Sequence, residues 1–129
     1  MLKPAVERAT EQIRAVFSGI PVIVREDGEG GAYIIVEEVD PGPPYEQRTT
    51  WIGFRITFQY PYADTYPHFV RGDLARADKG ALGEGMSQNH TFEGRGAVQI
   101  SRRSNHLDPT TETALLKLEK VLTWLASRS

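Results

Sequence analysis

Apolar residues near the N-terminus recur at steps of three and four, a spacing that places them on one face of a helix. The members of this series are Val6, Ala9, Ile13, Val16 and Phe17. Pro4 suits the first turn, where its missing N–H would have no partner in any case. Gly19 and Pro21 follow the series and are typical helix-ending residues. The pattern therefore predicts an N-terminal helix.

The middle of the chain has the pattern of β-strands. Residues 21–25 and 32–39 are predicted strands, and the DGEGG sequence at 27–31 is typical of a hairpin turn between them. Residues 50–60 form the clearest strand, because Ile, Phe and Tyr alternate there with Gly, Arg, Thr and Gln, so one face should be buried. A fourth short strand is predicted at 68–71.

The last third combines a long loop with a second helix. Residues 72–96 are rich in glycine and weakly periodic, and loops of that length are usually functional or mobile. A short apolar segment follows at 97–101. A helix is expected from Asp108, which can cap it, with Pro109 in its first turn. Its apolar stripe consists of Leu115, Leu118, Val121, Leu122 and Leu125.

This order of elements predicts a single α+β domain over residues 1–129, with a four-stranded antiparallel meander and helices on one face or end. The composition agrees: of 129 residues, 40% are hydrophobic and 25% charged, as in ordinary globular domains. No apolar run is long enough for a membrane span, and the charged N-terminus lacks a signal-peptide core. We expect a cytoplasmic protein that does not bind membranes.

Charge and residue types narrow the chemistry. A net charge of −2 disfavours a general nucleic-acid binder, which usually has a basic excess. The chain has no cysteine, so disulfides, thiolate zinc sites and thiol catalysis are excluded. Its three histidines are too widely spaced for a recognised zinc signature. No Gly-rich segment follows a strand and opens a helix, so no cofactor and no metal are expected.

Several motifs resemble those of the ubiquitin-conjugating (E2) family. Tyr60-Pro61 ends the third predicted strand and Tyr66-Pro67 precedes the fourth, similar to the Tyr-Pro run and downstream prolines of E2 proteins. Asn89-His90-Thr91 lies where the family has His-Pro-Asn, although the proline is missing. The segment at 94–100 resembles the one that carries the E2 active-site cysteine. Ala97 stands at the cysteine position, eight residues after Asn89.

Residues 99–124 look closer still to divergent E2-like proteins of bacterial ubiquitin-like conjugation operons. The resemblance covers nearly the whole chain in order of elements, and it implies a UBC-like fold with a long active-site loop. It also implies an enzyme that accepts a ubiquitin-like protein from an E1-like adenylating partner as a cysteine thioester and transfers it to an amine. Alanine at position 97 cannot form that thioester. Two interpretations follow. Ala97 is an engineered replacement of a catalytic cysteine, which the complete lack of cysteine favours, or the chain is a naturally non-catalytic E2-like adaptor.

The same resemblance gives roles to two neighbours of this position. The Asn89 amide would stabilise the oxyanion formed on the thioester, a donor worth about 3–4 kcal/mol in a dedicated site. His90 would deprotonate the attacking amine. Both residues also have plain structural interpretations, Asn89 as a turn residue and His90 as a loop histidine bonded to backbone.

Partner contacts are expected at two basic regions. Lys3, Arg8 and Arg14 on the first helix would dock on the E1-like enzyme, although surface solvation explains such a face equally well. A polar cluster after position 97 would line the groove for a flexible ubiquitin-like tail, or else form a solvated connection. Its members are Arg102, Arg103, Ser104, Asn105 and His106. His68 is interpreted as a partly buried, hydrogen-bonded structural residue.

An unrelated hydrolase remains an alternative. It would use His90 or His106 with a carboxylate, and the candidate carboxylates are Asp73, Asp78 and Glu93. No Gly-x-Ser-x-Gly elbow supports it.

Overall fold

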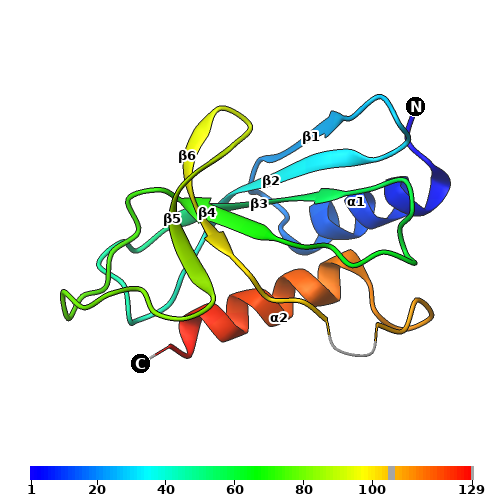
Figure 1. The fold of residues 1–129 in the computed structure, drawn as a ribbon. Coiled ribbons are helices and arrows are strands. Elements are labelled where there is room, and N and C mark those ends of the chain that lie inside the picture. The colour runs from blue at the N-terminus through cyan, green and yellow to red at the C-terminus, as the bar shows by residue number, and fades with distance from the viewer. Residues whose placement is uncertain (105–106, 129) are drawn as a thin grey trace.

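The computed structural model describes residues 1–104 and 107–128. They form one six-stranded antiparallel sheet with two helices packed on the same face (Figure 1). The predicted α+β class is confirmed. No helix in this part of the chain has the length and apolar content needed to cross a lipid bilayer.

The strands lie in the order β1-β2-β3-β4-β6-β5. Their bounds are β1 Val22–Glu26, β2 Ala32–Val39, β3 Thr50–Ile56, β4 His68–Arg71, β5 Met86–Phe92 and β6 Arg95–Ile100. The first four lie side by side in chain order. The β5–β6 hairpin then adds two strands at the β4 edge, so the predicted loop at 72–96 contains a strand and the sheet has six strands instead of four. Strand β3 also ends four residues earlier than expected, at Ile56.

Helix α1 spans Pro4–Val16 and begins at the predicted proline. Helix α2 spans Ala114–Ala126, so the predicted start near Asp108 was wrong. The Thr113 side chain is the N-cap and accepts a hydrogen bond from the Leu116 N–H at 3.0 Å. Asp108 instead caps a turn, since its carboxylate accepts hydrogen bonds from the backbone and side chain of Thr110.

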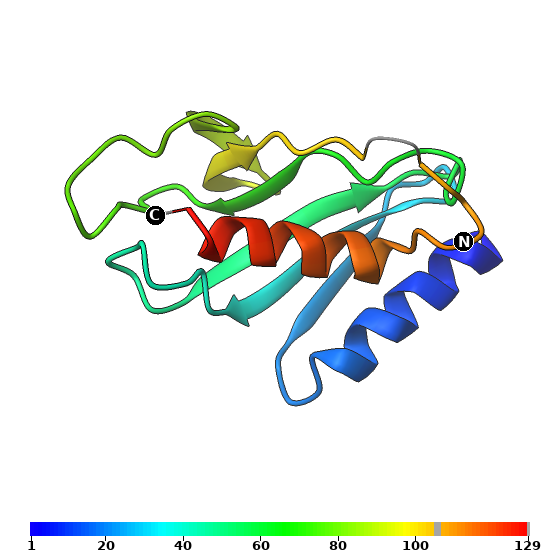
Figure 2. The same cartoon turned by 90° about the horizontal axis from the view of Figure 1, so that it is seen from below.

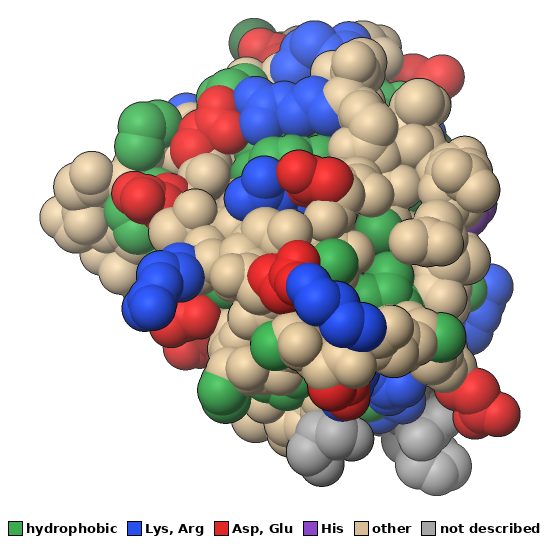
Figure 3. Space-filling view, turned by 90° about the vertical axis from the view of Figure 1, so that its left-hand side faces the viewer, with side chains coloured by type: hydrophobic (Ala, Val, Ile, Leu, Met, Phe, Trp, Pro, Cys, Tyr) green, Lys and Arg blue, Asp and Glu red, His purple; other side chains and the backbone are tan. Residues whose placement is uncertain are grey.

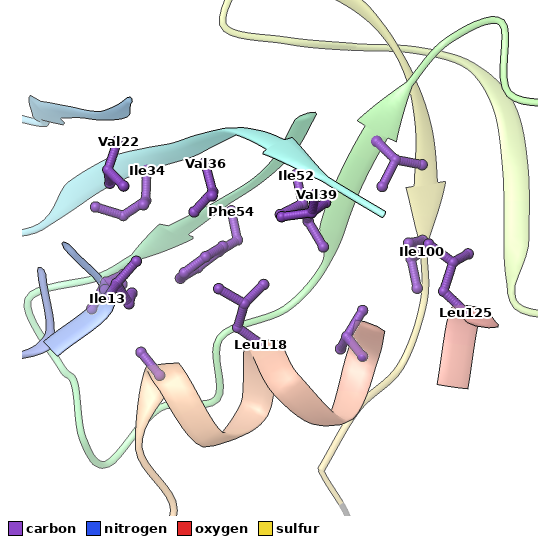
Figure 4. Packing of buried hydrophobic residues seen from close by; sticks show 14 of the residues in the cluster. Ile13, Val22, Ile34, Val36, Val39, Ile52, Phe54, Ile100, Leu118 and Leu125 are labelled. Carbon is purple, nitrogen blue, oxygen red and sulfur yellow. The ribbon is translucent and has the colours of Figure 1, made fainter. Parts of the chain in front are cut away.

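The main core lies between the sheet and the helices (Figures 2 and 4). Both helices run across the same face. Ile13 of α1 and Leu118 of α2 pack toward Ile34 and Phe54, which are cross-strand partners in β2 and β3, whereas Leu125 lies farther along α2, on the side of β6. These five side chains are fully buried, and each such side chain contributes roughly 1.5–3 kcal/mol of transfer free energy.

The opposite face of the sheet is covered by its own hairpin. In Figure 1 the β5–β6 hairpin rises on the side away from the helices. Its residue Phe92 stacks on Phe69 with ring centroids 4.9 Å apart and on Trp51 at 6.2 Å. Gly53 lies directly beneath, where a Cβ atom would sit 2.5 Å from the Phe92 ring. The absence of a side chain at Gly53 therefore lets the hairpin close onto the sheet.

Two ion pairs tie the hairpin tip to the opposite part of the sheet. Arg25 of β1 donates to Glu93 at 2.7 and 2.9 Å. Arg95 donates to Glu37 of β2 at 2.7 and 2.9 Å. The sheet thus curls, and an open groove remains beside the hairpin.

Candidate functional site

A groove on the face away from the helices has a volume of about 790 Å³. We call it the Ala97 groove. Its walls come from the end of β2, the start of β3, the end of β4 and the facing parts of β5 and β6. The residues that line it are Glu37, Thr49, Thr50, Trp51, Arg71, Gly72, Asp73, Asn89, His90, Thr91, Gly96 and Ala97. Three residues that the sequence singled out, Asn89, His90 and Ala97, therefore meet in one place.

Ala97 lies within strand β6 and is 1% exposed. It pairs with Arg71 of β4 on one side and His90 of β5 on the other. Its methyl group packs in the cluster that contains Ile35 and Phe92. The methyl group is thus buried in this small cluster, at the border of the groove. An alanine side chain supplies no nucleophile at this position.

Asn89 and His90 lie at an irregularity in β5. The register between β5 and β6 shifts between Ser87 and His90, and Asn89 has φ +67°, a left-handed conformation that asparagine tolerates better than most residues. Such a conformation costs about 1–3 kcal/mol and is found mostly at turns and functional sites. Here it places an exposed asparagine at the edge of the groove.

His90 has a partner that the sequence did not suggest. Its Nε2 atom lies 2.8 Å from Ser87 Oγ, and its ring meets that of Phe69 edge-on at 6.4 Å. A serine hydroxyl beside an imidazole is the first element of a nucleophile–base pair. The residues are three apart, but the bulge that brings them together carries no recognisable sequence signal.

The charged side chains of the groove are paired. Arg71 donates to both oxygens of Asp73, and these hydrogen bonds hold the pKa of that carboxyl below its usual value. The hydrogen bonds from Arg95 lower the pKa of Glu37 in the same way. Both carboxyls are therefore ionised acceptors at neutral pH. The groove combines an apolar floor at Trp51 with polar walls of fixed charge.

Arg102, Arg103 and Ser104 do not line the Ala97 groove. They lie against α2 and border a separate pocket of about 300 Å³. They lie apart from Ala97 because β6 ends at Ile100 and the chain then crosses to the helix side, and their expected contact with a ubiquitin-like tail stays a prediction. Asn105 and His106 fall outside the described residues.

The three basic residues that were predicted to form one face of the first helix lie in two different places. Lys3 and Arg8 border an open depression of about 730 Å³ that also includes Phe58 and Tyr62, which are 45% and 78% exposed. We call it the Phe58 depression. Arg14 is not part of it, because its guanidinium donates to the Val22 carbonyl at 2.9 Å and ties α1 to β1.

The carboxylates of the hydrolase alternative are scattered. Asp73 lines the Ala97 groove, whereas Asp78 is bonded to Arg76 and Glu93 to Arg25. No hydrogen bond joins His90 to a carboxylate in the described residues. Within the same residues, no group of three or more histidine or carboxylate side chains could hold a metal ion.

The end of the molecule next to β5 does not carry one sign of charge. Figure 3 views the end of the molecule where β5 and its neighbouring loops lie, and basic and acidic side chains alternate across it. The pairs include Arg76 with Asp78 and Lys79 with Glu46. Such a mixed surface lacks the continuous basic stripe that tracks a phosphate backbone.

Comparison with known proteins identifies no relative. No family model matches the chain, no curated protein matches it, and no solved structure matches it. The residues and their geometry alone therefore support a functional proposal.

Proposed function

We propose that this chain is an E2-like domain that binds the flexible tail of a ubiquitin-like protein in the Ala97 groove, and that with alanine at position 97 it acts as a non-catalytic adaptor. The observation that carries the proposal is the convergence of Asn89, His90 and Ala97 on one open groove. The E2 resemblance gives these positions to the oxyanion donor, the base and the nucleophile. Because the nucleophile position carries a methyl group, the domain could bind the tail but could not form a thioester with it.

The shape of the groove suits an extended chain. Trp51 offers apolar surface, and Asn89 and Thr91 offer hydrogen-bonding groups at the exposed strand β5. β5 is one of the two outer strands of the sheet, and a peptide can add to such an edge through main-chain hydrogen bonds. A flexible tail with small side chains fits this combination better than a folded surface does.

The first test measures whether a side chain at position 97 can be reached from the groove, and it needs no partner protein. Three single-cysteine variants would be compared by their rate of reaction with a thiol reagent: Gly96→Cys, Ala97→Cys and Val98→Cys. A side chain at Gly96 meets nothing within 4 Å, and Val98 is fully buried in the helix-side core, so these are the open and closed controls. We expect Ala97→Cys to react between the two. Protection equal to that of Val98→Cys in the folded protein contradicts the proposal.

The catalytic form of the same proposal has cysteine at position 97. Ala97→Cys, supplied with an E1-like enzyme, ATP and the ubiquitin-like protein, should form an adduct that a thiol reductant removes. Gly96→Cys is the matched control, since it has a thiol one residue away on the other face of β6. Non-covalent binding by the alanine form, with no adduct on Ala97→Cys, supports the adaptor. If the alanine form does not bind and Ala97→Cys forms no adduct, both forms of the proposal are refuted.

The Phe58 depression is the proposed docking site for the E1-like enzyme. Exposed aromatic rings beside cations are typical of protein interfaces, and Lys3 and Arg8 supply the charge. The double variant Lys3→Glu/Arg8→Glu should slow E1-dependent loading of Ala97→Cys without changing its thiol reactivity. Arg48→Glu, an exposed charge reversal elsewhere, should have no effect on loading.

The contact between Ser87 and His90 favours a second candidate, an ester hydrolase. Ser87 Oγ would attack the ester carbon while His90 Nε2 accepts its proton; the C–O bond to the alcohol breaks, the alcohol leaves with that proton, and water then hydrolyses the acyl-serine. Hydrolysis of p-nitrophenyl acetate should then fall to the rate of buffer in Ser87→Ala and His90→Ala alike. Equal rates in the parent chain and both variants dispose of this candidate.

A further inference from the structure

The polar segment after β6 forms a pocket with helix α2 that the proposed function does not use. We call it the Arg102 pocket. It has a volume of about 300 Å³, and it is lined by Arg102, Arg103, Ser104, Glu112, Lys117, Lys120, Val121 and Trp124. Four of these side chains are cations and one is a carboxylate. That excess is notable in a chain whose net charge is −2.

The base of the pocket is a buried lysine. Lys117 is 4% exposed, and its Nζ donates to both oxygens of Asp64 at 3.1 Å and to Ser104 Oγ at 2.9 Å. The backbone N–H and the hydroxyl of Ser104 also donate to Asp64. This network joins α2, the segment after β3 and the segment after β6. It fixes the chain that presents Arg102 and Arg103.

The two arginines lack acidic partners. Among the described residues, neither Arg102 nor Arg103 forms an ion pair, whereas Lys120 is bonded to Glu112 at 3.0 Å. Instead the Arg102 guanidinium lies 4.9 Å from the centre of the Trp124 ring, and that of Arg103 lies 4.0 Å from the Tyr66 ring.

Stacking on a ring orients a guanidinium and leaves its N–H groups free to donate. A second guanidinium, that of Arg128, lies 4.4 Å from the Trp124 ring. Two like charges beside one indole repel each other, and an anion between or near them offsets that repulsion. Paired N–H donors on arginine match the oxygens of a phosphate group.

We propose that the Arg102 pocket binds a phosphate monoester. Arg102 and Arg103 would donate to the phosphate oxygens, and Lys120 would add charge at the rim. The buried hydrogen bonds among Lys117, Asp64 and Ser104 would fix the floor of the pocket. Because the charge of Lys117 is already paired with that of Asp64, Lys117 would not pair with the ligand. The pocket volume lies at the lower end of the range for small-molecule sites, which favours a small phosphorylated molecule over a protein surface.

The test is a titration followed by the two indole N–H signals in a nitrogen–proton NMR spectrum, assigned with Trp51→Phe. Inorganic phosphate, glycerol 3-phosphate and a phosphoserine peptide would each be added at pH 7.5, with sodium chloride at equal ionic strength as reference. We expect a saturable shift of the Trp124 signal and none of the Trp51 signal. Tighter binding of glycerol 3-phosphate than of the peptide assigns a free small molecule, and the reverse order assigns a phosphorylated chain.

Arg102→Gln/Arg103→Gln should weaken phosphate binding at least tenfold. The matched control Arg8→Gln/Arg48→Gln removes the same charge from exposed sites elsewhere, and it should leave the affinity unchanged. A Trp124 shift that chloride reproduces, or an equal affinity in both double variants, overturns the proposal. Because the Ala97 groove shares no lining residue with this pocket, failure here leaves the proposed function untouched.

Discussion

From the burial of His68 we predict that the free energy of unfolding depends on pH in a specific way. The side chain is fully buried in β4 with its ring 4.8 Å from that of Phe54. Neither ring nitrogen has a hydrogen-bond partner in the described residues, in contrast to the hydrogen-bonded histidine that the sequence predicts. Burial, assisted by the nearby charge of Lys117 and opposed by that of Asp64, lowers the pKa of His68 from 6.5 to about 3.

The sign follows from proton binding. Between pH 6.5 and about 3 the unfolded chain holds a proton at His68 that the folded chain excludes, so the free energy of unfolding falls as pH falls through this window. The slope approaches about 1.4 kcal/mol for each pH unit, or roughly 2.7 kcal/mol at pH 4.5. That loss is a large part of the roughly 5–15 kcal/mol that holds a typical domain folded.

The perturbation is His68→Phe, which keeps an aromatic ring and removes both unpaired nitrogens. Urea unfolding would be measured for both proteins at pH 4.5, 5.5, 6.5 and 7.5. We expect the difference in unfolding free energy to be constant above pH 7 and to shift by about 1.4 kcal/mol per unit in favour of the variant below pH 6. Carboxyl groups are common to both chains and cancel in the difference. A difference that does not change with pH refutes the reasoning, even if repacking alters the absolute stability of the variant.

Three further predictions concern the hairpin packing, the cap of α2 and the buried ion pair. Gly53→Ala puts a Cβ 2.5 Å from the Phe92 ring and should lower the free energy of unfolding by about 1–3 kcal/mol, with less effect in a Phe92→Ala background; equal effects in both backgrounds argue against the contact. Thr113→Ala removes the cap of α2 and should cost about 1 kcal/mol by thermal melting. Asp64→Asn strands the buried Lys117 and should cost about 3 kcal/mol in urea unfolding, whereas Lys117→Met should cost much less; the opposite order contradicts the role of the pair.

Local patterns explain which parts of the fold the sequence predicts. The α1 residues Val6, Ala9 and Ile13 are buried as their spacing requires, and the turn at 27–31 joins β1 to β2. Strand β5 gives no such signal. Its central residues are polar and exposed, because it is an outer strand held by pairing with β6 and by a single buried ring, Phe92.

The site is less predictable than the fold, because its geometry depends on residues far apart in the chain. Asn89 and Ala97 meet as expected, since a hairpin brings nearby residues together. By contrast, Lys117 and Asp64 are 53 residues apart, and a lysine next to the apolar stripe of a helix is usually solvated. Their pairing is what turns the chain after β6 toward α2 and separates Arg102 from the Ala97 groove.

The β5–β6 hairpin sets how far position 97 is open, so its attachment to the sheet decides the chemistry available there. The ion pairs of Arg25 with Glu93 and Arg95 with Glu37 are partly exposed, and such pairs contribute only about 0–1 kcal/mol each. The Phe92 ring is buried against Trp51 and Phe69, and truncating a buried phenylalanine costs about 3–5 kcal/mol. Packing therefore outweighs charge in keeping the hairpin closed. A bound tail that displaced Phe92 would have to supply comparable apolar contact, whereas a tail lying along β5 beside Asn89 leaves the ring in place. If the chain binds a tail as proposed, we therefore expect the second arrangement, which leaves Phe92 and residue 97 in place beside the groove.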